Sequence, residues 1–354
     1  MLFYISIFTI LLILAIAEVL LKNKKISVIT GSLLAVIAGL RFYTGYDFIS
    51  YKNFFLEVES FSDVINGTID AESGFLFLNY VFKVMGFNFY TFVLFFSVLS
   101  IVLLGYFAYR FTTYPSLVLV YYYARYLLVR DMGQIRSALA CIILLYSIPF
   151  IIKKKPLQFL IIIFIASLFH VTSWFFVVAY IFNVLFKELT IKNVILLLLI
   201  ALGIGVIVQI PDSYIWAIPE RYNAYFTSPS YTDGQWIVNP VLWMQLVLFI
   251  AAYFFIRPTH DMGKNKFNVV IKIYFISSLI LISAGTLGTV GGRLSTLFAT
   301  TEIFITPLLF ASISKNKLLN LLFFCGFTVV IFCLIFILSG TYTEYIPYQT
   351  IFGL

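Results

Sequence analysis

Long apolar stretches, separated by short polar connections, make up most of this chain of 354 residues. Segments that cross a bilayer must be helical, because its core offers no water to backbone N–H and C=O groups. At roughly 20 residues per crossing, the pattern predicts an all-α, polytopic membrane protein with about 12 transmembrane helices. We place these helices at 2–21, 26–40, 88–109, 115–129, 134–152, 156–170, 171–187, 193–210, 240–256, 268–284, 295–313 and 318–338.

Two connections between the predicted helices are long, 41–87 and 211–239. The first contains an apolar stretch near 72–86 that is too short to span, so we expect an interfacial or re-entrant helix there. The second is rich in proline and aromatic residues and is expected to be a loop. The connections on the opposite side are only a few residues long, which leaves no room for a soluble domain. We therefore treat 1–354 as a single transmembrane domain.

The composition supports this class of protein and excludes others. Hydrophobic residues make up 62% of the chain and charged residues only 11%, whereas the surface of a soluble domain needs far more charge. Outer-membrane barrels are excluded because they show short alternating strands rather than unbroken apolar runs. The net charge of +8 comes mostly from lysines at one membrane face, so it does not indicate a nucleic-acid partner. The three cysteines lie inside predicted spans, which favours plain packing, and the two histidines are too few and too separated for a metal cluster. We therefore expect no metal and no cofactor.

Charged residues divide between the two faces of the predicted membrane domain. Threading the helices alternately places nearly all lysines at one face, which is then the cytoplasmic face, since positive charge resists translocation. The even number of helices leaves both termini outside. The outer face receives most of the acidic residues and six arginines: Arg41, Arg125, Arg130, Arg136, Arg221 and Arg293. Arginines there oppose the topology signal, which indicates an anionic ligand on the outer side.

The segment 41–51 leaves the second predicted helix at the outer boundary. Arg41 precedes a glycine turn, where a guanidinium can hold phosphate oxygens in a bidentate contact. Asp47 and Tyr51 follow closely enough to share the same pocket. The alternative is plain anchoring by a snorkelling arginine in an interfacial aromatic belt.

A second group of candidates opens the helix predicted at 134–152. Arg136 lies near its first turn, where free N–H groups and the helix dipole attract anions. Arg130 comes from the end of the preceding helix. Asp131 lies beside them, and its plain interpretation is that it caps the helix and pairs with an arginine.

Further candidates lie along the second half of the chain. His170 ends the helix predicted at 156–170, where a histidine can act as general base, proton relay or hydrogen-bond donor, or simply bond between helices. Arg293 follows a glycine-rich turn and begins a helix, which suits a phosphate. Glu302 lies further along that helix and is expected to pair with an arginine or to bind a sugar hydroxyl. Arg221 lies beside aromatic residues in the loop 211–239.

Several of these stretches, in this order, resemble the EpsG-type branch of the Wzy polysaccharide (O-antigen) polymerases. The resemblance rests on R-x-x-x-G-x-D-x-x-x-Y at 41–51, E-x-G-[FY]-x-x-[LF]-N at 72–79, L-F-H-x-[ST]-[SA] at 168–173, and the segments 131–140, 147–155, 292–294 and 346–348. Together they are spaced over nearly the whole chain. This chain has Gln134-Ile135-Arg136 where the family more usually shows an adjacent Arg-Gln.

The resemblance implies a glycosyltransferase-C-like membrane enzyme that joins oligosaccharide repeat units carried on undecaprenyl diphosphate. The growing glycan leaves its lipid for a sugar hydroxyl of the next unit, on the outer side of the bacterial inner membrane. The implied partners are the lipid-linked oligosaccharide, the lipid bilayer, a chain-length regulator and a flippase. An O-antigen-ligase-like transferase, or a flippase or transporter of lipid-linked sugars, is the alternative.

The candidate residues divide into three roles on this hypothesis. Arg136 and Arg293 are expected to hold the diphosphate and stabilise it as leaving group. Further contacts to the diphosphate are expected from Arg41, Arg221 or Arg130. Asp47 is the first candidate for the base that activates the acceptor hydroxyl, because a carboxylate at the headgroup boundary is ionised at neutral pH. The other candidates for the base are His170 and Glu72, and the expected sugar ligands are Tyr51, Asp131 and Glu302.

Overall fold

The computed structural model describes residues 1–354 apart from 211–213, 219, 221–222, 233, 257–262 and 354. In the described residues the regular elements are helices, accompanied by an isolated bridge between Arg41 and Thr350, so the all-α prediction is confirmed. The chain forms two compact units. The first unit contains 1–146, 161–173 and 310–354, and the second unit contains 147–160 and 174–309.

Six stretches of the described chain are helical, long and apolar enough to cross a membrane. They are α1 (Leu2–Leu21), α6 (Phe89–Phe111), α8 with α9 (Ile135–Leu145 and Ile148–Ile152), α12 (Ile191–Val208), α16 (Lys264–Ala284) and α19 with its π-helical end (Lys317–Phe332 and Cys333–Leu338). A seventh candidate is the pair α17 (Gly288–Ala299) and α18 (Glu302–Ala311), which is bent by 54°. These helices confirm a polytopic helical membrane protein.

The predicted count of 12 spans is not confirmed, because the other predicted spans form shorter helices. They are α2 (Ile26–Gly39), α7 (Pro115–Tyr122) with a short π-helix (Tyr123–Leu127), α10 (Pro156–Ser167), a 3₁₀ helix (Val171–Phe176) with α11 (Val177–Leu185), and α15 (Pro240–Phe255). At 1.5 Å per residue, a helix such as α10 is only about 18 Å long, well short of a bilayer core. The described helices therefore support six or seven crossings by length and composition, and the remaining predicted crossings stay a prediction.

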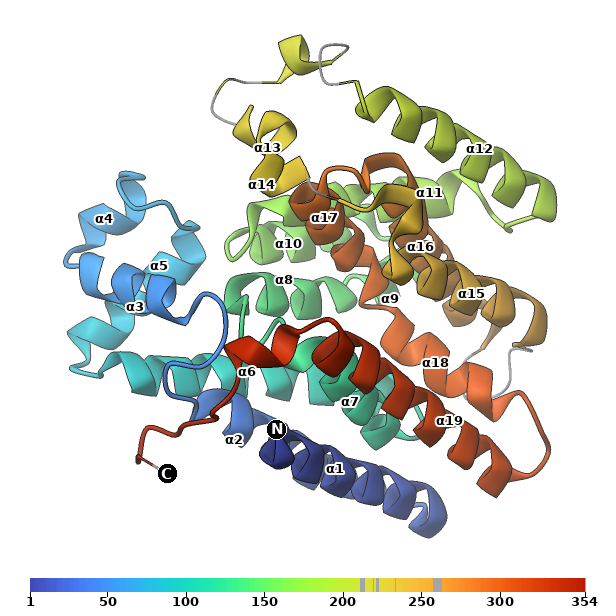
Figure 1. Cartoon of the computed structure of the whole chain (residues 1–354), viewed down its shortest axis with the longest axis horizontal. Coiled ribbons are helices and arrows are strands. Elements are labelled where there is room, and N and C mark those ends of the chain that lie inside the picture. Colours follow the sequence, from blue (N-terminus) through green and yellow to red (C-terminus); the bar gives the residue numbers. More distant parts are fainter. Residues whose placement is uncertain (211–213, 219, 221–222, 233, 257–262, 354) are drawn as a thin grey trace. The chain divides into compact units, whose positions relative to one another are not determined.

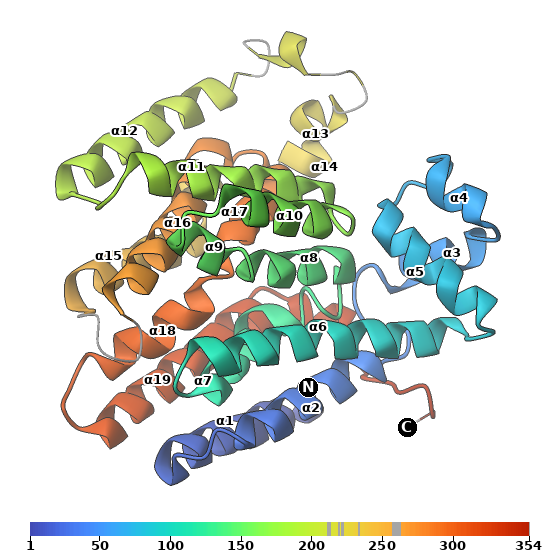
Figure 2. The ribbon, with the colours of Figure 1, turned by 180° about the vertical axis from the view of Figure 1, so that it is seen from behind.

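In the first unit, α2 packs along α6, and α1 packs against both α2 and α7 (Figures 1 and 2). Local sequence sets where these helices begin. Asn88 caps α6, since its side chain accepts a 2.9 Å hydrogen bond from the N–H of Thr91. Pro115 starts α7 at a position where a helix needs no N–H donor.

The connection 41–87 folds into three short helices of the first unit, α3 (Phe48–Glu57), α4 (Phe61–Ile65) and α5 (Ser73–Val84) (Figure 1). Lys83 ties α5 to the end of α3, because its Nζ donates to the carbonyl oxygens of Leu56 and Val58 at 2.7 Å each. The side chain of Phe75 is fully buried and meets rings of α3 and α6. A helix near 72–86 is thus present as expected, and its interfacial placement stays a prediction.

In the second unit, α16 is the helix around which the others pack. It contacts α9, α11, α12, α15 and α17. Lys272 is buried on α16, and its Nζ donates to the carbonyl oxygens of Phe186 and Lys187, which follow the end of α11. The described part of 211–239 holds α13 (Ala224–Thr227), α14 (Pro229–Thr232) and two 3₁₀ turns (Ile215–Ala217 and Trp236–Val238). A last 3₁₀ turn, Thr341–Glu344, belongs to the first unit.

Candidate functional site

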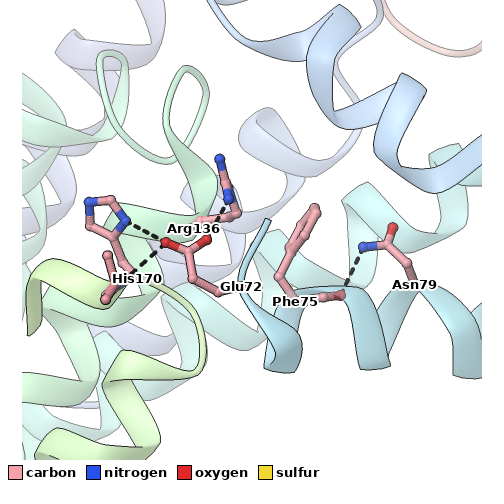
Figure 3. Close-up of polar contacts among 6 residues, drawn as sticks. Glu72, Phe75, Asn79, Arg136 and His170 are labelled. Atoms are coloured by element: carbon pink, nitrogen blue, oxygen red, sulfur yellow. Dashed lines mark hydrogen bonds and ion pairs between the residues drawn. The ribbon is translucent and has the colours of Figure 1, made fainter. Parts of the chain in front are cut away.

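A carboxylate that joins a cation to a histidine forms the centre of the candidate site. Glu72 is the N-cap residue of α5, and its carboxylate lies between Arg136 and His170 (Figure 3). The Oε1 atom lies 3.0 Å from Nδ1 of His170 and accepts a 3.2 Å hydrogen bond from the N–H of Val171. The Oε2 atom forms an ion pair with Nη1 of Arg136. All of these residues belong to the first unit.

Each side chain reaches this centre from the end of a helix. Arg136 is the second residue of α8, and His170 follows the turn that ends α10. The three side chains are 14–22% exposed, so they are shielded from solvent over most of their surface. Helix ends that converge in this way bring together groups that lie far apart in the sequence.

Aromatic rings surround the guanidinium of Arg136. It lies 5.8 Å from the ring centre of Tyr51, 5.2 Å from that of Phe54 and 5.6 Å from that of Phe75. Such rings attract a cation electrostatically and hold it in place. Because a guanidinium has five N–H donors, the contact with Glu72 leaves donors for an anionic ligand.

The electrostatic balance at Glu72 favours the ionised carboxylate. Burial by itself raises the pKa of this carboxyl group. The hydrogen bond with His170 and the charge of Arg136 act the other way, and together they bring the pKa below its ordinary value of 4.5. Glu72 is therefore an anion at neutral pH.

One ring nitrogen of His170 is bound and the other is not. The ionised carboxylate of Glu72 accepts hydrogen bonds only, so Nδ1 carries the proton that it donates. In the neutral ring, Nε2 then holds a free lone pair. That atom is buried and has no hydrogen-bond partner among the described residues, as is true of Oγ1 of Thr172 and Oγ of Ser173. The arrangement can accept a proton from a hydroxyl group brought to Nε2.

Three of the predicted site residues lie elsewhere in the first unit and are buried. Asp131 accepts hydrogen bonds from the hydroxyl groups of Ser100 at 2.7 Å and Tyr122 at 2.5 Å. Arg41 is 1% exposed, and its Nη1 donates to the carbonyl oxygen of Ala38. Arg130 is also buried, with its guanidinium 4.3 Å from the ring centre of Tyr126.

The remaining predicted residues have separate locations. Asp47 is the N-cap residue of α3 and is partly exposed. In the second unit, Arg293 is exposed on α17, whereas Glu302 is fully buried on α18 and accepts a 2.9 Å hydrogen bond from the hydroxyl of Tyr274. Arg221 lies outside the described residues. Of the predicted set, the structure thus brings together Glu72, Arg136, His170 and Tyr51.

Sequence reasoning assigned no role to several residues that build the site. Phe54 and Phe75 supply two of the three rings around Arg136. Gly74 lies inside the pattern E-x-G-[FY]-x-x-[LF]-N and lets α5 approach the turn before His170 closely. The signal was the fixed spacing of that pattern, which ties an acid, a glycine and a ring to one helix start. Within the described ranges, no group of three or more His, Cys, Asp or Glu side chains is placed to hold a metal ion.

A known protein family matches a range of the chain that includes the whole candidate site. The model of the EpsG family matches residues 24–350. This range contains every residue of the candidate site and both units. No curated protein and no solved structure shows a significant match to the chain.

Proposed function

Since the chain belongs to the EpsG family, whose members are associated with exopolysaccharide biosynthesis, we propose that it is a polysaccharide polymerase. Its substrate would be an oligosaccharide repeat unit on undecaprenyl diphosphate. The growing glycan is transferred to a sugar hydroxyl of the next lipid-linked unit, on the outer side of the bacterial inner membrane. A flippase that delivers these units and a chain-length regulator are the protein partners of such an enzyme.

The observation that carries this proposal is that the carboxylate of Glu72 contacts both a cation, Arg136, and a candidate base, His170. Glycan transfer from a lipid diphosphate requires a proton acceptor for the attacking hydroxyl and positive charge for the leaving phosphate. His170 supplies a free Nε2 lone pair, and Arg136 supplies a guanidinium with unused donors. Glu72 binds both, so the two functions lie on either side of one carboxylate (Figure 3).

The proposed step is a single displacement at a sugar carbon. Nε2 of His170 removes the proton from the acceptor hydroxyl, and the oxygen attacks the anomeric carbon of the growing glycan. The bond from that carbon to the diphosphate oxygen breaks, and its electron pair leaves with the lipid diphosphate. Arg136 stabilises the negative charge on the leaving group, and Glu72 stabilises the imidazolium that His170 becomes.

The described contacts change which residues we assign to the base and to the diphosphate. We assign the base to His170 ahead of Asp47, because the described contacts orient one of its nitrogens and leave the other free. We assign the first diphosphate contact to Arg136 rather than to Arg41, which is buried and donates to a backbone carbonyl. Arg293 is exposed and remains a second candidate for the diphosphate.

A second candidate function, a flippase for lipid-linked sugars, draws on a different observation. The pair α17 and α18 is bent by 54°, and Glu302 lies fully buried at the start of α18. Transporters often bind substrates or ions at such interrupted helices, and a buried acid among membrane helices usually has a function.

Reconstitution distinguishes the two functions. The purified protein in liposomes is mixed with lipid-diphosphate-linked repeat units, without nucleotide, and the products are separated on a gel. A polymerase gives a ladder of lengthened lipid-linked chains. His170→Ala should slow its growth strongly, and Lys154→Ala, at an exposed position of the second unit, should leave it intact. Movement of the unit between leaflets without a ladder would instead support the flippase.

A further inference from the structure

We propose that Gly74 is a positioning residue, which allows the backbone of α5 to dock on Leu168 and thereby sets the separation of Glu72 and His170. The inference rests on the proposed function, in which His170 is the base. It goes beyond that function because it assigns a role to a residue that has no reactive group. It also explains why an acid, a glycine and a histidine from two distant segments act together.

The contact between Gly74 and Leu168 is a close approach of two backbones. The N–H of Gly74 donates a 2.9 Å hydrogen bond to the carbonyl oxygen of Leu168. A Cβ atom added at position 74 would lie 2.7 Å from that oxygen and 2.7 Å from Cβ of Leu168. Glycine is required here for space, since it lacks the atom that would collide.

This contact lies next to the candidate site in both of the segments that it joins, the start of α5 and the turn that follows α10. Glu72 is two residues before Gly74, and His170 is two residues after Leu168. The backbone bond from Gly74 and the side-chain bonds from Glu72 run between the same two segments. A displacement at Gly74 is therefore transmitted directly to the carboxylate.

Packing and hydrogen bonds hold both the start of α5 and the turn that contains Leu168 in place, so neither can easily move apart from the other. On the α5 side, Phe75 is fully buried against rings of Phe92 and Phe96. On the other side, the N–H groups of Phe169 and His170 both donate to the carbonyl oxygen of Ala166, which holds the turn in place. The colliding oxygen of Leu168 belongs to the backbone, so no change of rotamer can remove it.

The expected loss of activity follows from how far a Cβ atom at position 74 would push the two backbones apart. Relieving contacts of 2.7 Å to the ordinary 3.4 Å requires a movement of about 0.7 Å. A 3.0 Å hydrogen bond between Glu72 and His170 would then exceed the range in which such bonds form. Misplacement of about 1 Å can cost a catalytic group on the order of 100-fold in rate. We expect Gly74→Ala to lower kcat about 10- to 100-fold with little change in KM for the lipid-linked unit.

The test combines activity with a direct readout of the histidine ring. The chain has two histidines, so a His260→Gln background leaves His170 as the sole source of imidazole signals. ¹⁵N NMR of the purified protein in detergent then reports which ring nitrogen carries the proton. We expect protonation at Nδ1 with Gly74, and a shift toward the Nε2-protonated form in Gly74→Ala. Gly326→Ala is the matched control, because a Cβ there meets nothing within 4 Å, and it should change neither kcat nor the spectrum.

The outcomes separate this inference from the proposed function. An unchanged spectrum and unchanged kcat in folded Gly74→Ala would overturn the positioning role. If the reference protein forms no ladder, the polymerase proposal fails while the spectra still test the positioning of His170. If Gly74→Ala does not reach the membrane, Glu72→Asp withdraws the carboxylate without touching Leu168. It should reproduce both changes, and a normal spectrum and kcat there would equally overturn the inference.

Discussion

Replacing Glu72 by glutamine tests the central contact of the site most directly. The side chain keeps its size, and its remaining oxygen can still accept from Nδ1 of His170 and the N–H of Val171. What is lost is the negative charge that stabilises the imidazolium and pairs with Arg136. Hydrogen bonds to charged groups contribute about 1.5–3 kcal/mol, and each 1.36 kcal/mol is a factor of ten in rate. We therefore expect kcat to fall about 10- to 100-fold, at unchanged protein level.

The assay is the initial rate of ladder growth at saturating lipid-linked repeat unit. Glu57→Gln is the control. Glu57 is exposed at the end of α3, so this substitution makes the same chemical change away from the site. A Glu72→Gln enzyme that keeps its rate, or a control that loses as much, would refute the reasoning.

A double-mutant cycle sharpens the same test. His170→Ala removes the base and should reduce kcat about 100- to 10,000-fold. If Glu72 acts through His170, adding Glu72→Gln to that variant should cost much less than it does alone, since interacting residues are not additive. Fully additive losses would show that Glu72 serves Arg136 only.

Four further outcomes follow from the described contacts. The pKa of Glu72 is held below its ordinary 4.5, so the stability that its ionised form contributes is complete above about pH 4.5 and is lost as the pH falls through the lowered value. The difference in melting temperature between the unaltered protein and Glu72→Gln should be constant above that pH and shrink below it, and a gap that grows in acid would contradict the assignment. Arg136→Ala should abolish the ladder at normal membrane level while Lys154→Ala is silent, and equal behaviour of the two would exclude the diphosphate contact. Asp131→Asn should act on folding, since it weakens two buried hydrogen bonds worth about 1 kcal/mol each, and is checked by protein level and melting temperature. A cysteine placed near Asp63 should react with an impermeant reagent from outside and one at Lys154 should not, and the reverse pattern would invert the predicted topology.

The class of fold followed from the chain alone, and the number of crossings did not. Apolar runs identify helices because the bilayer core demands internal hydrogen bonding. They do not report helix length, and 156–170 and 171–187 have the composition of spans although their helices are short. Helix length depends on where turns and caps interrupt the run, as at His170, and on the packing around them.

Sequence reasoning named four residues of the candidate site, Glu72, Arg136, His170 and Tyr51, but did not group them. Arginines on the disfavoured face marked Arg136 as a first contact to the diphosphate and Arg41 as a further one, and a histidine among membrane helices marked His170 as a candidate base. Their surroundings separate them, since Arg41 is buried against a backbone carbonyl and Arg136 is partly exposed beside a carboxylate. Asp47 ranked above His170 and Glu72 on sequence because a carboxylate at the headgroup boundary is ionised at neutral pH. No spacing rule connects residue 72 to residue 170.

The sequence by itself determined a helical membrane protein with a resemblance to one family, because hydrophobicity, charge asymmetry and motif spacing are local properties of the chain. The tertiary structure decided which polar groups meet. Glu72 and His170 are separated by almost a hundred residues, and they meet because α5 docks on the turn after α10 at Gly74. That contact depends on the exact fit of two backbones in space, which no one-dimensional pattern contains.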